Sequence, residues 1–184
     1  TSKTYVEVIN ILKQIKFKIP FSVENGGACY IPIKNTRSYK YKKILNPYAI
    51  NKEIIKKILN KNIFKKYSHN IEFIGDLSFS KQKKITKLNY NQLENFNSRE
   101  YTIPILWHGD KNLKKEFEIS LLKYKLKIAF GGKLHNISGL HSKVDSMNFF
   151  TNKYKKKFRA KKLITISLGD SENDIEILNN SNYS

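Results

Sequence analysis

The chain has 184 residues, of which 40% are hydrophobic, so it can form one ordinary domain or a small core that carries an inserted cap. No apolar run approaches the ~18 residues of a membrane-spanning helix, and the single cysteine, Cys29, excludes an internal disulfide framework and fits a reducing cytoplasm. The net charge of +20 comes from lysines spread along the chain, accompanied by many isoleucines and asparagines, with only three arginines. This favours an AT-rich coding bias over a nucleic-acid surface, because arginine makes most bidentate contacts to phosphates and bases.

The first third of the chain alternates between helix and strand. Apolar residues at helical spacing predict a helix over 5–16, followed by strands over 19–23 and 28–33. Between the strands, Gly26 and Gly27 follow Asn25, which predicts a tight turn with positive φ. Residues 34–47 are polar and have little periodicity, so we interpret them as a crossing between two domains.

The middle of the chain continues this alternation and then gives a long helix. The patterns predict helices over 51–67, 113–126 and 142–154, strands over 71–77 and 101–107, and a strand–turn–strand unit over 127–137.

The segment from Leu163 to Leu168 has the unbroken apolar pattern of a strand buried on both faces of a parallel sheet. Asp170 would then lie on the loop at the carboxyl end of this strand, where open α/β sheets bind their ligands, and Asp174 begins a helical pattern. Two carboxylates in such a loop suit Mg²⁺. From these residues alone, a capping box formed by Ser171 and Asp174 explains the pattern equally well.

Lys143 is the second informative residue. Ser142 and Asp145 form a capping-box pattern that places Lys143 in the first turn of a helix, where a cation opposes the helix dipole by roughly 0.3–1 kcal/mol. A phosphate bound at the same helix N-terminus would explain that placement. In a chain so rich in lysine, a chance occurrence explains it as well and is favoured when Lys143 is considered alone.

Five elements together point to one family. They are Thr1-Ser2-Lys3-Thr4, Glu24-Asn25-Gly26-Gly27-Ala28, Gly131-Gly132-Lys133, Lys143, and Gly169-Asp170-Ser171-x-Asn173-Asp174. In order and spacing they resemble phosphatases of the haloacid dehalogenase superfamily, most closely the mannosyl-3-phosphoglycerate phosphatases and their glucosyl-3-phosphoglycerate neighbours. The resemblance implies an α/β fold with a Rossmann-like core and an inserted α+β cap. It also implies a Mg²⁺ cofactor and hydrolysis of a phosphorylated sugar-glycerate through an aspartyl-phosphate.

The resemblance also assigns roles to individual residues. Lys143 would neutralise charge between nucleophile and phosphate, Asp170 would bind the metal, and Asp174 would orient Lys143 or a metal-bound water. Thr1 or Ser2 would donate a hydrogen bond to a phosphate oxygen, with the register favouring Thr1. We expect Lys143 and Asp170 to share one pocket beside Thr1 and Ser2. The remaining phosphate- or substrate-binding positions implied by the resemblance are Lys3, Asn25, Gly26, Gly131, Gly132, Lys133 and Asn173.

The chain departs from the family pattern in several places. It contains no Asp-x-Asp-x-Thr motif, which carries the family's nucleophile, and it ends soon after the last motif. We therefore expect a fragment that lacks the first strand and the C-terminal end, and that is inactive by itself. Val144 replaces a glycine, and Lys133 replaces an arginine and so loses the bidentate fork. The expected division is core over 1–34 and 136–184, with the cap over 35–135.

The leading prediction is a cytoplasmic, Mg²⁺-dependent glycosyl-3-phosphoglycerate phosphatase that makes a compatible solute such as mannosylglycerate. Its partner would be a small phosphorylated sugar-glycerate, with no membrane. The alternatives are another sugar-phosphate phosphatase of the superfamily, or a non-catalytic basic protein that binds nucleic acid. The sequence distinguishes neither mannosyl from glucosyl substrates nor one oligomeric state from another.

Overall fold

The computed structural model describes residues 1–34, 38–131, 134–159 and 161–184. The helices are α1 (Tyr5–Gln14), α2 (Lys52–Leu59), α3 (Asn62–Lys65), α4 (Phe79–Thr86), α5 (Tyr90–Asn97), α6 (Lys111–Leu122), α7 (Lys143–Phe158) and α8 (Ile175–Asn179). The strands are β1 (Phe21–Val23), β2 (Ala28–Pro32), β3 (Tyr41–Leu45), β4 (Ile71–Phe73), β5 (Thr102–Trp107), β6 (Leu126–Gly131) and β7 (Leu134–Gly139). Short 3₁₀ turns are η1 (Glu24–Gly26), η2 (Ser68–Asn70), η3 (Ile74–Asp76) and η4 (Glu172–Asp174).

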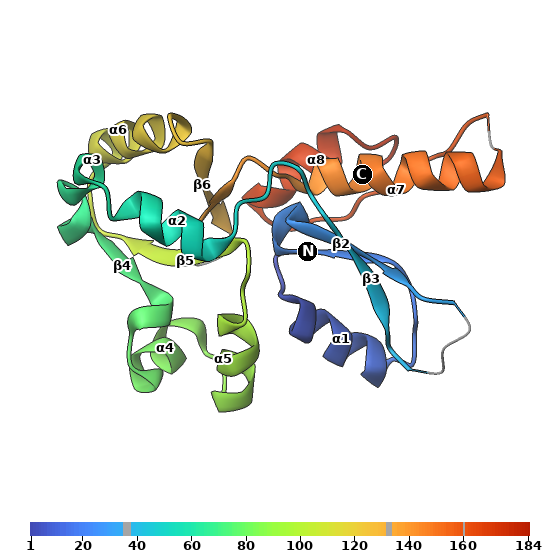
Figure 1. Cartoon of the computed structure of the whole chain (residues 1–184), viewed down its shortest axis with the longest axis horizontal. Coiled ribbons are helices and arrows are strands. Elements are labelled where there is room, and N and C mark those ends of the chain that lie inside the picture. Colours follow the sequence, from blue (N-terminus) through green and yellow to red (C-terminus); the bar gives the residue numbers. More distant parts are fainter. Residues whose placement is uncertain (35–37, 132–133, 160) are drawn as a thin grey trace.

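The first sheet is antiparallel, with the order β1-β2-β3. In Figure 1 it lies between α1 and the long helix α7. Its core is small: Val8 and Leu12 of α1 pack against Val23, Ala28 and Tyr30 of the strands. Helix α1 begins at a capping box between Thr4 and Glu7, which fixes where the chain turns from its first residues into the helix.

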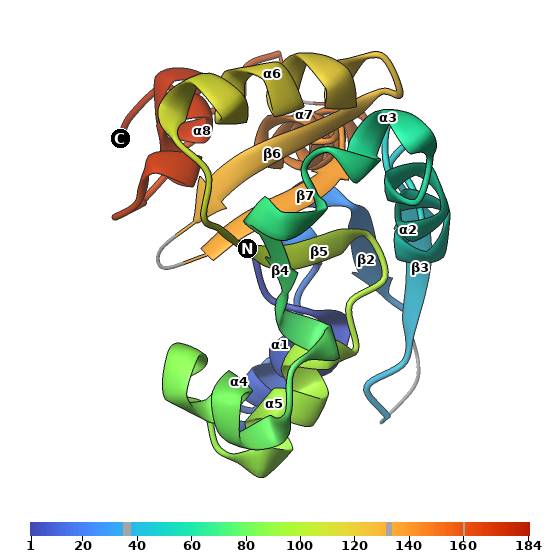
Figure 2. The same ribbon diagram turned by 90° about the vertical axis from the view of Figure 1, so that its left-hand side faces the viewer.

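The second sheet is also antiparallel, with the order β4-β5-β7-β6. Figure 2 shows α2, α3 and α6 along one side of this sheet, and α4 and α5 beyond the end of β4. Alternate strand residues face those helices and form the largest core. The buried members of this core are Ile55, Leu59, Phe64, Tyr67, Ile103, Ile105, Phe117, Leu121, Leu126 and Ile137.

Most predicted elements are confirmed. The helices predicted over 5–16, 113–126 and 142–154 appear as α1, α6 and α7, and the helix predicted over 51–67 divides into α2 and α3. Two helices, α4 and α5, were not predicted. The segment interpreted as a crossing contains β3, which pairs with β2 although its side chains are mostly exposed and show little apolar alternation.

The predicted buried strand over Leu163–Leu168 is wrong. In the described residues this segment makes only one isolated parallel bridge, between Ile166 and Tyr183. Ile166 and Leu168 are 72% and 89% exposed. A strand is buried on both faces only when it belongs to a sheet that is covered on both sides, and neither described sheet contains this segment.

The division into core and cap stays a prediction. Strand β3 lies within the predicted cap range of 35–135 but pairs with β2 of the first sheet. Strand β7 extends beyond residue 135 and pairs with β5 and β6 of the second sheet. No described helix combines the length and the hydropathy that crossing a membrane requires.

Candidate active site

The predicted tight turn after β1 is confirmed. Glu24, Asn25 and Gly26 all have positive φ, at 48°, 58° and 98°. A Cβ on Gly26 would lie 1.9 Å from the carbonyl oxygen of Ser142, the residue that caps α7. Glycine is therefore required both by the backbone angle and by the close approach, and this contact brings Asn25 beside the N-terminus of α7.

The carboxylate of Glu24 binds this turn to residues 100–102. Glu24 is 1% exposed, and its carboxylate accepts hydrogen bonds from the backbone N–H groups of Glu100 (2.8 Å), Tyr101 (2.9 Å) and Thr102 (2.9 Å). It also accepts one from the Thr102 hydroxyl, at 2.7 Å. We call Glu24 with these donors the Glu24 latch. It joins the turn after β1 to the start of β5 in the second sheet.

The residues of this turn are part of the family resemblance, but the resemblance assigned no role to Glu24. The role depends on residues 76 to 78 positions away, so no local spacing reveals it. Arg99 completes the arrangement: its guanidinium donates to the Thr102 hydroxyl (3.0 Å) and to the carbonyl of Ser2 (3.1 Å).

Lys143 is the first residue of α7, as predicted. Ser142 and Asp145 form the expected capping box, in which the Asp145 carboxylate accepts from the Ser142 N–H at 2.8 Å and the Ser142 hydroxyl accepts from the Asp145 N–H at 3.3 Å. The Lys143 ammonium forms an ion pair with Asp174 and donates to the Asn173 side-chain oxygen at 3.2 Å. The side chains of Lys143 and Asp174 are 12% and 14% exposed, so solvent screens this pair only weakly.

Asp174 is held as a carboxylate by its neighbours. Burial opposes its ionisation, but hydrogen bonds from Lys143 and from the Ser171 hydroxyl outweigh that effect and lower the pKa of the Asp174 carboxyl. The Ser171 hydroxyl lies 2.8 Å from Asp174 and 2.6 Å from the side-chain oxygen of Asn173. The structure thus joins Lys143, Asn173 and Asp174 in one cluster, which we call the Lys143 cluster.

Two other predicted residues, Asp170 and Thr1, do not belong to the Lys143 cluster. Asp170 is exposed, and its backbone hydrogen-bonds the Asp174 carboxylate. The Thr1 carbonyl accepts from the Asn25 N–H at 2.8 Å, so Thr1 lies beside the turn after β1.

Four further residues were predicted to bind phosphate or substrate. Lys3 lines a separate cavity with Glu7 and Gln92, on the α1–α5 side. Gly131 ends β6, opposite Leu134 of β7. Gly132 and Lys133 lie outside the described residues.

A cavity of about 140 Å³ opens beside the Lys143 cluster, and we call it the site cavity. It lies where four elements meet: the turn after β1, the start of α7, the η4–α8 segment and the β6–β7 hairpin of the second sheet. Its lining consists of Asn25, Lys127, Ala129, Asn136, Ser138, His141, Ser142, Lys143, Glu172, Asn173 and Glu176.

His141 is a buried, neutral member of this lining. It is 0% exposed, and its Nε2 lies 3.0 Å from the carbonyl oxygen of Glu24, to which a neutral ring donates. Burial lowers the pKa of His141 to about 4, and the nearby cation of Lys127 acts in the same direction.

We expect the free energy of unfolding to decrease as the pH is lowered, because of His141. Between pH 6.5 and about 4 the unfolded chain binds a proton on this histidine that the folded chain does not, so the free energy of unfolding decreases as the pH falls. The loss reaches up to about 3 kcal/mol, at about 1.4 kcal/mol per pKa unit. Urea unfolding at several pH values, for the parent and for His141→Gln, measures it. The glutamine keeps a donor without titrating, so an identical pH slope in both proteins would contradict this assignment.

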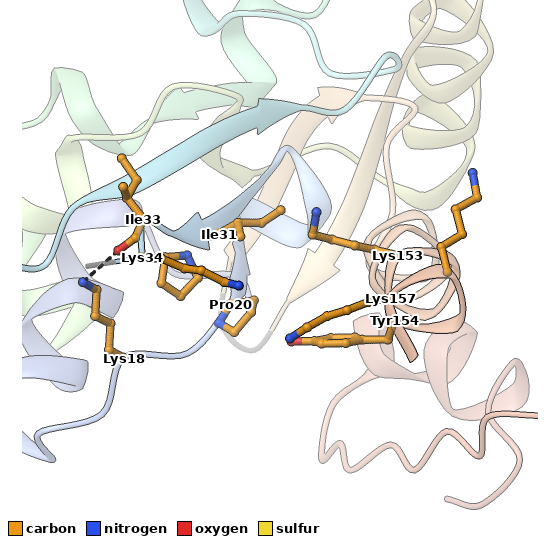
Figure 3. Close-up of a pocket in the computed structure, with 10 residues that line it drawn as sticks. Lys18, Pro20, Ile31, Ile33, Lys34, Lys153, Tyr154 and Lys157 are labelled. Atoms are coloured by element: carbon orange, nitrogen blue, oxygen red, sulfur yellow. Dashed lines mark hydrogen bonds between the residues drawn. The ribbon is translucent and has the colours of Figure 1, made fainter. Parts of the chain in front are cut away.

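A second, larger cavity of about 830 Å³ lies between the C-terminal end of β2 and α7. Figure 3 shows Lys18, Pro20, Ile31, Ile33 and Lys34 on one side of it, and Lys153, Tyr154 and Lys157 of α7 on the other. None of the predicted site residues lines this cavity. Of the predicted residues, Asn25, Lys143 and Asn173 line the smaller cavity, whereas Thr1, Ser2, Asp170 and Asp174 do not line it.

The metal ligand predicted from the sequence is Asp170. The described residues contain no cluster of three or more histidine, cysteine, aspartate or glutamate side chains. Mg²⁺ is usually held by one or two carboxylates together with substrate phosphate and water, so a single free carboxylate fits a shared Mg²⁺ site. Asp174 is already engaged with Lys143. Asp170 is an exposed carboxylate that does not line the site cavity, whereas the exposed Glu172 and Glu176 do line it, so Asp170 stays a predicted ligand.

The fold has close matches among solved structures. A haloacid dehalogenase-like hydrolase of *B. subtilis* superposes with a TM-score of 0.55 at 15% identity, covering 98% of this chain and 73% of its own. The TM0651 protein of *Thermotoga maritima* gives 0.58 at 18% identity, covering 98% and 69%. The chain therefore has the fold of the haloacid dehalogenase-like hydrolases, in which a Rossmann-like core carries a cap, and the predicted α/β fold class is confirmed.

Curated relatives show which kind of phosphatase the chain resembles in sequence. A glucosyl-3-phosphoglycerate/mannosyl-3-phosphoglycerate phosphatase of *Persephonella marina* is 30% identical over 188 residues, and one of *Methanococcoides burtonii* is 27% identical over 188. Both alignments cover 97% of this chain and 66% of the relative, so the chain spans just under two thirds of their length. A mannosyl-3-phosphoglycerate phosphatase of *Pyrococcus furiosus* is 26% identical, covering 95% and 70%. No family model matches the chain.

These findings confirm the resemblance drawn from the motifs. The chain is a homologue of the mannosyl- and glucosyl-3-phosphoglycerate phosphatases, which are phosphoric monoester hydrolases.

Proposed function

We propose that this chain is the phosphate-binding and substrate-covering part of a Mg²⁺-dependent phosphatase that acts on a glycosyl-3-phosphoglycerate. The observation that carries the proposal is the Lys143 cluster: a lysine at a helix N-terminus, held by a half-buried aspartate and an asparagine, beside a polar cavity. The names of the curated relatives supply the substrate class.

Each residue of the cluster has a task that follows from its position. The Lys143 ammonium and the N-terminus of α7 both present positive charge to the cavity, where phosphate binds. Asp174 fixes the position of Lys143, so that the charge is already in place when negative charge develops on the phosphate oxygens. Asn25 and Asn173 supply further polar groups to the same wall. When bound at Asp170, Mg²⁺ would supply Lewis-acid stabilisation of the phosphate charge.

The chain itself contains no Asp-x-Asp-x-Thr motif. We propose that this nucleophile belongs to the whole coding sequence in which the chain lies, and that the reaction proceeds by in-line attack and an aspartyl-phosphate that water hydrolyses. The product would be a glycosylglycerate used as a compatible solute, made in the cytoplasm.

The test is phosphate release by the protein expressed from its whole coding sequence. We expect release from mannosyl- or glucosyl-3-phosphoglycerate with Mg²⁺ and none with EDTA. Asp170→Asn should raise the Mg²⁺ concentration needed for half-maximal activity about tenfold or more, because a neutral amide replaces an anionic oxygen ligand. Asp76→Asn is the matched control, since Asp76 is exposed and distant from the site cavity.

Two outcomes would contradict the proposal. One is the absence of phosphate release from any phosphate ester, which would favour the non-catalytic alternative. The other is Mg²⁺-dependent turnover by the 184 residues alone, which would place the nucleophile among residues assigned no such role.

A further inference from the structure

The wall of the site cavity opposite α7 is the polar face of the β6–β7 hairpin. Leu126 and Ile128 of β6 pack into the core of the second sheet. Because successive strand residues point to opposite faces, Lys127 and Ala129 face the cavity, and both line it. Their cross-strand partners Ser138 and Asn136 line it as well.

Lys127 differs from the other lysine of the cavity in having no partner at ion-pair distance. Within the described ranges, Lys143 pairs with Asp174, whereas Lys127 forms neither an ion pair nor a side-chain hydrogen bond. Lys127 is half-buried, and burial lowers the pKa of its ammonium group. A cation withdrawn from water without a partner is costly, so the cavity favours a ligand that brings a negative charge.

The nearby carboxylates do not form an ion pair with Lys127. Glu176 and Asp145 act on Lys127 electrostatically, from beyond ion-pair distance. Asp145 already accepts hydrogen bonds from the Ser142 N–H (2.8 Å) and from the Asn46 amide (3.2 Å). Glu172 and Glu176 line the cavity from the η4–α8 side, but both are exposed, so solvent screens their charges.

We propose that Lys127 binds a second anionic group of the substrate, the carboxylate of its glycerate part, while the Lys143 cluster binds the phosphate. The proposal rests on the proposed function and deepens it: the substrate class is a phosphate monoester whose carbon skeleton carries a carboxylate. Lys127 would then set specificity without touching the reacting phosphorus.

The test compares two probes that differ in the carboxylate alone. 3-Phosphoglycerate carries phosphate and carboxylate, and glycerol 3-phosphate carries the phosphate without the carboxylate. Calorimetric titration of the protein from its whole coding sequence, with Mg²⁺ chelated so that no turnover occurs, gives both dissociation constants. We expect the parent to bind 3-phosphoglycerate about tenfold or more tightly than glycerol 3-phosphate, the usual effect of one charge-assisted hydrogen bond.

Three variants make the assignment specific to Lys127. Lys127→Met should remove the preference by weakening 3-phosphoglycerate binding, and should leave glycerol 3-phosphate binding within about twofold of the parent. Lys127→Arg should retain the preference, because it keeps the charge. Lys123→Met, at an exposed lysine just before β6, should change neither dissociation constant.

The outcomes separate this proposal from the proposed function. Binding of both probes with equal affinity by the parent would overturn the role of Lys127 and leave the phosphate site in place. An equal loss for both probes in Lys127→Met would also overturn it, since a lysine that binds only carboxylate cannot affect glycerol 3-phosphate. If the parent binds neither probe with Mg²⁺ chelated, and again neither with Mg²⁺ present, the phosphate site itself fails, and the proposed function fails with it.

Discussion

Replacing Lys143 by alanine is expected to lower kcat for phosphate release by two to three orders of magnitude in the protein expressed from its whole coding sequence. The loss corresponds to roughly 2.7–4 kcal/mol, the usual effect of removing one preorganised electrostatic donor. Lys143 is oriented before the substrate arrives, by Asp174 and by Asn173 at 3.2 Å, so its charge requires no rearrangement during the reaction.

The measurement is steady-state kinetics with saturating Mg²⁺. Lys155→Ala is the matched control, because Lys155 is an exposed lysine on the same helix, away from the site cavity. The apparent affinity for Mg²⁺ should change little in Lys143→Ala, since the proposed metal ligand is Asp170. An unchanged kcat would remove Lys143 from the catalytic machinery, whereas a loss matched by Lys155→Ala would point to a general effect of charge.

Glu24→Gln is expected to lower the free energy of unfolding by about 3–5 kcal/mol. The carboxylate is 1% exposed and accepts four hydrogen bonds, three of them from backbone N–H groups. An amide presents one acceptor and one donor group, so part of that donor set would be left facing an NH₂ group in a buried place. Arg99 would also lose the nearest compensating charge while itself buried.

Urea unfolding monitored by circular dichroism gives this value. Glu53→Gln is the control, because Glu53 is an exposed glutamate in the first turn of α2. A difference of less than about 1 kcal/mol between Glu24→Gln and the parent would mean that the latch adds little to stability. The backbone donors would then have to find other partners.

The features that were predictable from sequence are those encoded within a few residues. The capping box of Ser142 and Asp145 placed Lys143 in the first turn of α7, and the glycines after Asn25 indicated a positive-φ turn. A similar local signal was available for α5, whose capping box joins Asn89 and Gln92. It was overlooked because the apolar pattern of that segment is weak.

The remaining features depend on distant parts of the chain. The contact between Lys143 and Asp174 was expected only through the family resemblance, since 31 positions separate the two residues. Lys127 was missed because its place on the cavity wall follows from the register of β6 against β7, which one strand cannot reveal. The strand prediction over Leu163–Leu168 failed for a similar reason: its apolar pattern suits a strand within a covered sheet, and membership of a sheet depends on other parts of the chain.

The Glu24 latch has a mechanical consequence. The latch fixes the turn after β1 to the start of β5, and the same turn is wedged against Ser142 through Gly26. Gly139 approaches the Tyr48 carbonyl so closely that a Cβ there would lie 2.2 Å from it. Any rotation of the second sheet relative to α7 would therefore pivot about these contacts. Lys143 follows Ser142 in the chain, and Lys127 pairs across the hairpin with Ser138, the neighbour of Gly139, so both lysines of the site cavity lie close to these contacts. Such a rotation would leave the spacing between the two lysines nearly unchanged, and a fixed spacing suits a bound molecule of one length.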